Sequence, residues 1–350
     1  MAYYIRETLS ERPALSPRRP TINEFFLSSY TLSIYTGCEL GCPYCDSWIY
    51  QERPLNEQIY VPLDLPQRLA AELTGVDRGD LIAITALSDP YQPAEQTYRI
   101  TRQTLQVLAE RQQPVLLLTK SAMVLEDKTL LQRMNERSLA VVMTTLVTVD
   151  PHLSERLEGK APAPALRLEM LRELKRAGVP VGVALVPIIP YVTDRQTALR
   201  SLVRACADAQ VDFVVWDYLH IPNEHHRVRI HELLARVGNY PVSYYRDLYR
   251  DQPTVNPIYR QEIDRELLDR CDGLGLEARA PHRIFAGRLA PRNEAALLLK
   301  HAAFRDRVQG RELVALKERA LADQIYAGTI DPLALRESSL YPLVREVLGL

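Results

Sequence analysis

Residues 36–45 read Thr36-Gly37-Cys38-Glu39-Leu40-Gly41-Cys42-Pro43-Tyr44-Cys45 and hold three of the five cysteines in the chain. The spacing is C-x3-C-x2-C, directly after a predicted strand, so three thiolates on one short loop can surround a single metal centre. Gly37 and Gly41 let the backbone bend tightly, and Pro43 stiffens the last step. The segment therefore predicts a metal-binding loop at the end of a strand.

The number of cysteines in this loop bears on which metal it binds. Structural zinc normally needs four ligands in two pairs, and Cys206 and Cys271 stand alone far downstream. A [4Fe–4S] cluster also usually takes four cysteines, so three of them leave one iron open to an external ligand. An open coordination position is typical of a catalytic metal site. A zinc site, an incidental cysteine group and an open cluster are the alternatives at this point.

Short apolar runs alternate with helical patterns over the middle of the chain. The predicted strands are Tyr30–Thr36, Asp80–Thr85, Pro114–Thr119, Ala140–Thr145, Pro180–Val186 and Asp212–Tyr218. Helical periodicity is clearest over Ala165–Ala177, Glu95–Arg111 and Arg195–Ala209. Near-continuous apolar strands separated by helices predict a parallel α/β sheet covered on both faces. The order of elements leaves an open barrel and a doubly wound sheet as alternatives.

The two ends of the chain differ from this middle part. Residues 1–27 are polar and rich in proline, which predicts an irregular N-terminal arm. Residues 28–220 hold the alternating pattern, and residues 221–350 are mainly helical in pattern, with His225–Val237, Pro257–Arg270 and most of Asn293–Leu350 as helices. We interpret residues 221–350 as accessory helices that close or flank the barrel.

Composition excludes several classes of protein. Hydrophobic residues make up 47% and charged residues 25%, which is typical of a globular protein and not of a disordered one. The 43 Lys and Arg balance 44 Asp and Glu, so net charge does not favour a nucleic-acid partner. The longest apolar stretch, Val179–Pro190, is too short for a bilayer about 30 Å thick. With few cysteines and no apolar run near Met1, we expect a reducing, cytoplasmic location and no membrane partner.

The C-x3-C-x2-C motif, with Tyr44 just before Cys45, resembles the signature of the radical S-adenosylmethionine (radical SAM) superfamily. Two further motifs, Ser88-Asp89-Pro90-Tyr91-Gln92-Pro93-Ala94-Glu95 and Thr119-Lys120-Ser121, resemble the spore photoproduct lyase-like branch. The resemblance implies an incomplete (β/α)6 parallel barrel with C-terminal accessory helices. It also implies a [4Fe–4S] cluster on Cys38, Cys42 and Cys45 that binds S-adenosylmethionine and, once reduced, yields a 5′-deoxyadenosyl radical.

Roles for five further residues follow from the same resemblance. Tyr44 is expected near the adenine, Ser88 and Asp89 near the methionyl amino group, Lys120 near the methionyl carboxylate and Thr145 near the ribose. Each has a structural alternative: Tyr44 as a shield of the cluster, Asp89 as a helix N-cap, and Lys120 in an ion pair with Asp89 or Glu95. An electron donor such as flavodoxin or ferredoxin is the implied partner.

This chain differs from the spore photoproduct lyase-like branch at a position that matters for the reaction. True spore photoproduct lyases carry a hydrogen-donor cysteine two residues before the serine of the Ser-Asp step, where this chain has Ala86. We therefore expect a radical SAM enzyme that abstracts hydrogen from an unknown substrate. A nucleic-acid lesion lyase or modification enzyme and a non-catalytic metal-binding scaffold are the alternatives.

The sequence also contains residues without an assigned role. Cys206 is expected in a helix core, whereas Cys271 is a candidate hydrogen donor or ligand of a second cluster. Other candidates are a histidine group, residues at the end of the last strand and a basic segment: His225, His226 and His231; Trp216, Asp217, Tyr218 and His220; Arg279, His282, Arg283, Phe285, Arg288 and Arg292. Solvated helices and loops are the expected reading of the histidine group and the basic segment.

Overall fold

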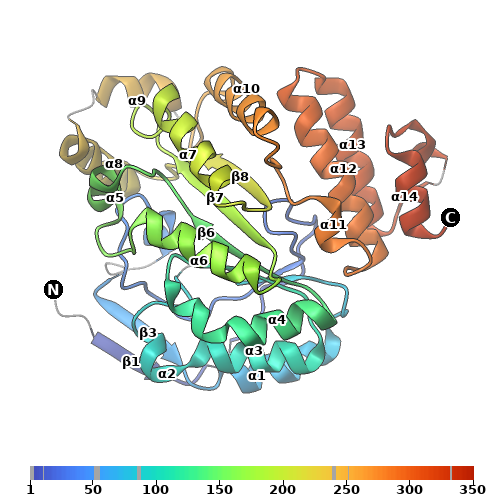
Figure 1. Cartoon of the computed structure of the whole chain (residues 1–350), viewed down its shortest axis with the longest axis horizontal. Coiled ribbons are helices and arrows are strands. Elements are labelled where there is room, and N and C mark those ends of the chain that lie inside the picture. The colour runs from blue at the N-terminus through green and yellow to red at the C-terminus, as the bar shows by residue number, and fades with distance from the viewer. Residues whose placement is uncertain are drawn as a thin grey trace.

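A computed structural model describes residues 4–10, 12–50, 56–84, 88–238, 242–250, 252–331 and 333–350. Within these residues the main sheet has six strands, each parallel to its neighbours. Their order in the sheet follows the chain: β2 (Tyr30–Thr31), β4 (Ile82–Ile84), β5 (Val115–Leu118), β6 (Ala140–Thr145), β7 (Val181–Ile188) and β8 (Phe213–Tyr218). The sheet curls into a half barrel, so the predicted incomplete (β/α)6 barrel is confirmed (Figure 1).

Helices connect successive strands, and the longer ones cover the outer face of the half barrel. The connecting helices are η1 (Asp46–Tyr50), α1 (Leu65–Glu72), η2 (Leu73–Gly75), α2 (Glu95–Tyr98), α3 (Ile100–Arg111), η3 (Ala122–Asp127), α4 (Lys128–Arg137), α5 (Pro151–Glu158), α6 (Pro164–Arg176) and α7 (Gln196–Asp208). The single helix predicted over Glu95–Arg111 is divided, because Arg99 adopts a left-handed conformation with φ of 54° between α2 and α3. The sequence had no glycine there to signal this break.

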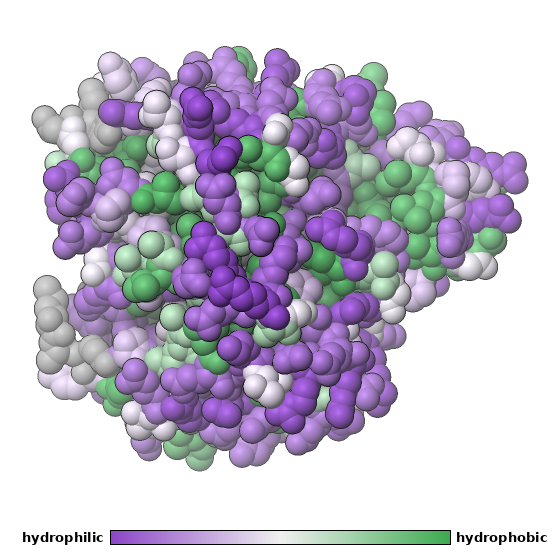
Figure 2. All heavy atoms as spheres, in the orientation of Figure 1, coloured by the Kyte–Doolittle hydropathy of each residue, from purple (hydrophilic) through white to green (hydrophobic). Residues whose placement is uncertain are grey.

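The C-terminal part of the chain is helical, as predicted. It contains α8 (Glu224–Val237), α9 (Val242–Tyr249), α10 (Pro257–Gly273), α11 (His282–Phe285), α12 (Pro291–Val308), α13 (Glu312–Ala327), η4 (Ala334–Glu337) and α14 (Tyr341–Leu348). Helices α12 and α13 lie side by side at one end of the molecule, next to α14 (Figure 1). Hydrophilic side chains dominate the face shown in Figure 2, and hydrophobic ones gather between α13 and α14.

Successive strand residues point to opposite faces and build two separate cores. Val115, Leu117 and Val142 pack with the outer helices, in a cluster that includes Leu105 and Leu171. Leu116, Val141, Met143, Phe213 and Val215 alternate with them on the inner face, in a second cluster with Phe285, Leu297, Leu299 and Ile325 of α11, α12 and α13. Both faces of the sheet are therefore buried, which explains the continuous apolar strands.

The N-terminal arm departs from the prediction in one place. Residues 1–27 were predicted to be irregular, but Tyr4–Thr8 form strand β1, which pairs in parallel with β3 (Gln58–Pro62) in a separate two-stranded sheet. Strand β1 is mostly exposed and has no apolar pattern of its own, although Ile59 and Val61 of β3 are buried. The pairing depends on backbone hydrogen bonds between segments far apart in the chain, which no local pattern reveals.

Candidate cofactor site

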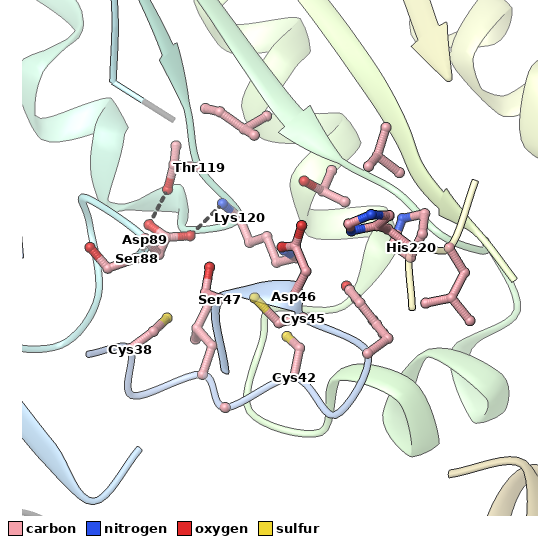
Figure 3. Close-up of a pocket in the computed structure, with 18 of the residues that line it drawn as sticks. Cys38, Cys42, Cys45, Asp46, Ser47, Ser88, Asp89, Thr119, Lys120 and His220 are labelled. Atoms are coloured by element: carbon pink, nitrogen blue, oxygen red, sulfur yellow. Dashed lines mark hydrogen bonds between the residues drawn. The ribbon is translucent and has the colours of Figure 1, made fainter. Parts of the chain in front are cut away.

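One cavity of about 360 Å³ lies at the carboxyl ends of the strands, where active sites of such barrels occur. It is lined by all eight residues that the sequence singled out as a site, namely Cys38, Cys42, Tyr44, Cys45, Ser88, Asp89, Lys120 and Thr145. Figure 3 shows the three cysteines on the loop after β2, opposite Asp89 and Lys120, which follow β4 and β5. Phe26, Leu118 and Val186 close the cavity on the side of the inner core.

The cysteine loop is held in shape by the segment after β4. Gln92 accepts a hydrogen bond from the Glu39 backbone N–H at 2.8 Å and donates one to the Gly37 carbonyl at 3.3 Å. The Glu39 carboxylate in turn accepts from the Ala94 N–H at 2.8 Å. Gly37 and Gly41 have φ values of 84° and 57°, so the tight bend expected of these glycines is present. The D-P-Y-Q-P-x-E motif thus shapes the cysteine loop.

The same segment also fixes the turn that carries Lys120. Asp89 accepts hydrogen bonds from the Thr119 hydroxyl at 2.6 Å, the Lys120 backbone N–H at 2.8 Å and the Tyr91 N–H at 2.9 Å (Figure 3). Ser88 donates its hydroxyl proton to the Tyr35 carbonyl at 2.8 Å and keeps lone pairs free to accept. The N-cap of α2 is Ala94, so the alternative of Asp89 as the helix cap is wrong.

Lys120 is paired with a residue that sequence analysis did not identify. Its ammonium lies 3.8 Å from the Glu158 carboxylate. The alternative considered above, an ion pair of Lys120 with Asp89 or Glu95, is therefore wrong, because the partner is Glu158. Burial alone would lower the Lys120 pKa, but the side chains of Cys42 and Glu158 act in the opposite direction, and the pKa is raised. Lys120 therefore remains a cation inside the cavity.

Glu158, at the end of α5, joins three elements around the cavity. The Tyr44 hydroxyl donates a hydrogen bond to it, and Arg167 of α6 lies 2.7 Å from its second oxygen. Arg167 also donates to the Thr145 carbonyl at 2.9 Å. The side chains of Glu158 and Arg167 are fully buried, where an ion pair is favourable only if further hydrogen bonds support it. These bonds fix Tyr44, Lys120 and the end of β6 relative to one another.

The donor chemistry of the loop fits a thiolate-ligated cluster. In the part of the chain that the structure describes, no three His, Cys, Asp or Glu side chains converge as the ligands of a single metal ion would. The three thiols instead line the cavity at separate positions along the loop (Figure 3). In a cluster each cysteine takes a different iron, whereas one zinc ion needs its ligands on one atom.

Burial controls the protonation of these thiols. It raises the pKa of Cys38 to about 11 and that of Cys42 to about 12, and it also raises the pKa of Cys45. The positive charge of Lys120 acts in the opposite direction on Cys42 and Cys45. Without a metal the thiols are therefore protonated at neutral pH, and metal binding must release their protons.

Several other candidates lie away from the cavity. Cys206 and Cys271 are fully buried on α7 and α10 and do not line the cavity, so Cys271 is not placed to act there as the hydrogen donor considered above. Its role as ligand of a second cluster stays a prediction. Trp216 donates its ring N–H to Asp264 at 2.7 Å and does not line the cavity, whereas Tyr218 and His220 do. Ala86 lies outside the described residues.

The histidine group and the basic segment form no common site. His225 is exposed and His226 is buried, although both are on α8. In the basic segment, Arg279 stacks 3.5 Å from the Phe304 ring, Arg288 donates to Asn135 at 2.8 Å, and His282 contacts Glu294 at 2.7 Å. These side chains connect separate structural elements. His226 and Arg279 are buried, so the expectation of solvated helices and loops is wrong at these two positions.

Comparison with known proteins identifies what the chain is similar to. The family model of the Radical SAM superfamily matches residues 32–202. The uncharacterized protein Rv2578c of Mycobacterium tuberculosis is 29% identical over 247 residues, 67% of this chain and 71% of that protein. The uncharacterized protein MJ0683 of Methanocaldococcus jannaschii is 26% identical over 172 residues, 48% of this chain and 63% of that protein.

Solved structures agree on the fold. Spore photoproduct lyase complexed with dinucleoside spore photoproduct superposes with a TM-score of 0.60 at 12% identity, over 77% of this chain and 79% of that one. A mutant of the same lyase with bound AdoMet and dinucleoside spore photoproduct gives a TM-score of 0.57 at 13% identity, over 73% and 77% of the two chains. Among the described residues, no helix is long and apolar enough to span a bilayer.

Proposed function

We propose that this chain, whose residues 32–202 match the family model of the Radical SAM superfamily, cleaves S-adenosylmethionine reductively and abstracts hydrogen from a substrate. When bound by Cys38, Cys42 and Cys45, a [4Fe–4S] cluster supplies the electron that releases methionine and a 5′-deoxyadenosyl radical. The observation that carries the proposal is the gathering of these cysteines with Asp89 and Lys120 around one cavity.

The chain's own residues would bind and orient S-adenosylmethionine. Lys120, a cation at the cavity wall, is suited to its carboxylate, and the Asp89 carboxylate and Ser88 lone pairs are suited to its ammonium. Tyr44 and Thr145 lie on the same cavity for the adenine and ribose. The apolar side chains of Phe26, Leu118 and Val186 would exclude water from the reacting atoms.

The composition of the cavity favours a reaction other than a thiol-dependent lyase. All five cysteines lie in the described part of the chain, and only Cys38, Cys42 and Cys45 line the cavity. A product radical there would have no fourth thiol from which to recover hydrogen. We therefore propose a substrate other than the one that spore photoproduct lyase holds in its solved complex. Flavodoxin or ferredoxin is proposed as the electron donor.

Product analysis tests this function. Protein reconstituted with iron and sulfide under anaerobic conditions should convert S-adenosylmethionine to 5′-deoxyadenosine and methionine after reduction with dithionite. Lys120→Ala should weaken S-adenosylmethionine binding and leave the iron–sulfur absorbance intact, whereas Lys128→Ala, at a surface pair with Glu173, should change neither. An intact cluster that leaves S-adenosylmethionine uncleaved would favour the non-catalytic scaffold.

A further inference from the structure

An arginine from the C-terminal helices lies directly behind the cysteine loop. The guanidinium carbon of Arg229, on α8, is 3.4 Å from the centre of the Trp48 ring. Trp48 belongs to η1, which follows Cys45, and its side chain is buried. The face of an indole ring carries partial negative charge and attracts a cation placed over it. The contact between α8 and η1 therefore holds a positive charge against the segment after the third cysteine.

Trp48 is itself bonded to the cysteine loop. Its indole N–H donates to the Cys42 carbonyl at 2.8 Å, and its backbone N–H donates to the Cys45 carbonyl at 3.4 Å. Trp48 is thus bonded to two of the three cysteines, through its ring to Cys42 and through its backbone to Cys45. A change in Arg229 acts on the loop through this ring, without any bond of its own to a cysteine.

The charge of Arg229 has few compensating anions. None of the ion pairs among the described residues includes Arg229, and its Nε is buried without a hydrogen-bond partner there. Burial lowers the Arg229 pKa, and the groups that act on it are Glu232 and Arg236 of its own helix and Cys45 across the contact. A half-buried cation normally has an anion nearby. From the facing loop, the Cys45 sulfur becomes such an anion once a metal binds and its proton is released.

We propose that Arg229 is a positioning residue that makes the cluster on Cys38, Cys42 and Cys45 easier to reduce, a role that rests on the function proposed above. Reduction adds a negative charge to the cluster. A positive charge held close to it, in surroundings of low dielectric constant, stabilises the reduced form. Helix α8, which lies outside the matched family domain, thereby contributes to the electron-accepting site.

The reduction potential of the reconstituted cluster tests this role. Arg229→Gln and Arg229→Met remove the charge, and Met also keeps much of the packing length. Both should shift the midpoint potential, measured by a redox titration followed by electron paramagnetic resonance, to more negative values at unchanged iron and sulfide content. Arg229→Lys should stay near the wild type. Arg204→Gln, an exposed charge removal on α7, is the matched control and should cause no shift.

The outcomes separate this inference from the proposed function. If the clusters of Arg229→Gln and Arg229→Met have the wild-type midpoint potential, Arg229 does not affect that potential and the inference is overturned. If Arg229→Lys shifts as far as the neutral variants, packing and not charge is responsible, and the inference is overturned as well. If the wild-type protein binds no iron–sulfur cluster, the proposed function fails first and this role with it.

Discussion

A single carboxylate, that of Glu158, connects the side chains that would hold the cofactor. It accepts from Tyr44 and lies beside Lys120 and Arg167, all from different elements. Sequence analysis found Tyr44 and Lys120 from their motifs but missed Glu158 and Arg167. Tyr44 and Glu158 are 114 positions apart in the chain. A glutamate at the end of an amphipathic helix is usually exposed, so no local signal marks it.

Replacement of Glu158 should therefore be costly. Glu158→Gln leaves two buried cations without their anion, and we expect a loss of about 3 kcal/mol in the free energy of unfolding, measured by urea denaturation. Binding of S-adenosylmethionine should also weaken. Glu169→Gln is the control, since Glu169 pairs with Arg172 and Arg176 at the surface. A loss no greater than that of the control would contradict the account of Glu158.

A second residue-scale prediction concerns pH. Burial lowers the pKa of His226 to about 4; Asp46 opposes this shift, and Arg229, His220 and His225 add to it. An unfolded histidine titrates near 6.5, so the unfolded chain binds a proton first as the pH falls. The stability from neutral His226 is present above pH 6.5 and is lost between about pH 6.5 and pH 4.

Variants of the two adjacent histidines test this. His226→Leu removes the titrating group, and neither ring nitrogen of His226 has a hydrogen-bond partner among the described residues. The free energy of unfolding of His226→Leu should fall less steeply than that of the wild type when the pH is lowered from 7 to 4.5. His225→Gln, at an exposed position on the same helix, should follow the wild type. Equal slopes for all three proteins would show that His226 contributes nothing.

At the scale of elements, the start of β4 is joined to α12 by a close backbone contact. The Gly79 carbonyl accepts hydrogen bonds from the Ala290 N–H and the Asn293 side chain, both at 3.0 Å. A Cβ atom at Gly79 would lie 2.3 Å from the Ala290 nitrogen. Only glycine permits this approach, because a methyl group would push the two backbones apart.

Gly79→Ala should consequently destabilise the protein by about 1–3 kcal/mol, as overpacking usually does. Gly75→Ala is a matched control, since a Cβ at Gly75 meets nothing within 4 Å. Thermal unfolding should show a lower midpoint for Gly79→Ala and an unchanged or slightly higher one for Gly75→Ala. Similar midpoints for both variants would mean that α12 moves away without cost.

The sequence predicted the place of each strand of the main sheet better than it predicted where each strand ends. The segment Ala140–Thr145 is a strand with the predicted bounds, and four of the other predicted segments each contain a strand. Strand β7 overlaps the remaining segment, Pro180–Val186, but continues to Ile188. The first is much shorter than predicted, with β2 limited to Tyr30–Thr31. Residues after Thr31 bend toward the cysteine loop, where Thr36 pairs with Tyr60 instead. Apolar runs identify buried strands, but they do not show where a strand leaves the sheet.

For the whole molecule, the accessory helices do more than flank the barrel. Their side chains form the inner core with strand residues such as Leu116, Met143 and Phe213. The periodicity of α12 could not reveal this, because that helix is buried on most of its sides. The packing indicates that the stability of the barrel depends on α11, α12 and α13. The domain boundaries at residues 27 and 220 stay predictions.

Removal of residues 282–350 tests this dependence. The truncated chain would expose the inner face of the sheet, so we expect aggregation or loss of a cooperative unfolding transition by circular dichroism. The full chain should unfold in a single transition. A truncated protein that stays monomeric and unfolds cooperatively would show that the half barrel is stable without α11 to α14.

The central claim is that three thiolates leave one position of an iron–sulfur cluster free for S-adenosylmethionine. Electron–nuclear double resonance on the reduced, anaerobic protein with S-adenosylmethionine labelled at its amino nitrogen tests it most directly. We predict a hyperfine coupling from that nitrogen, absent in Cys42→Ala, which should lack the cluster. Coupling from a protein histidine nitrogen in its place, or a protein that binds zinc and no iron, would contradict the account.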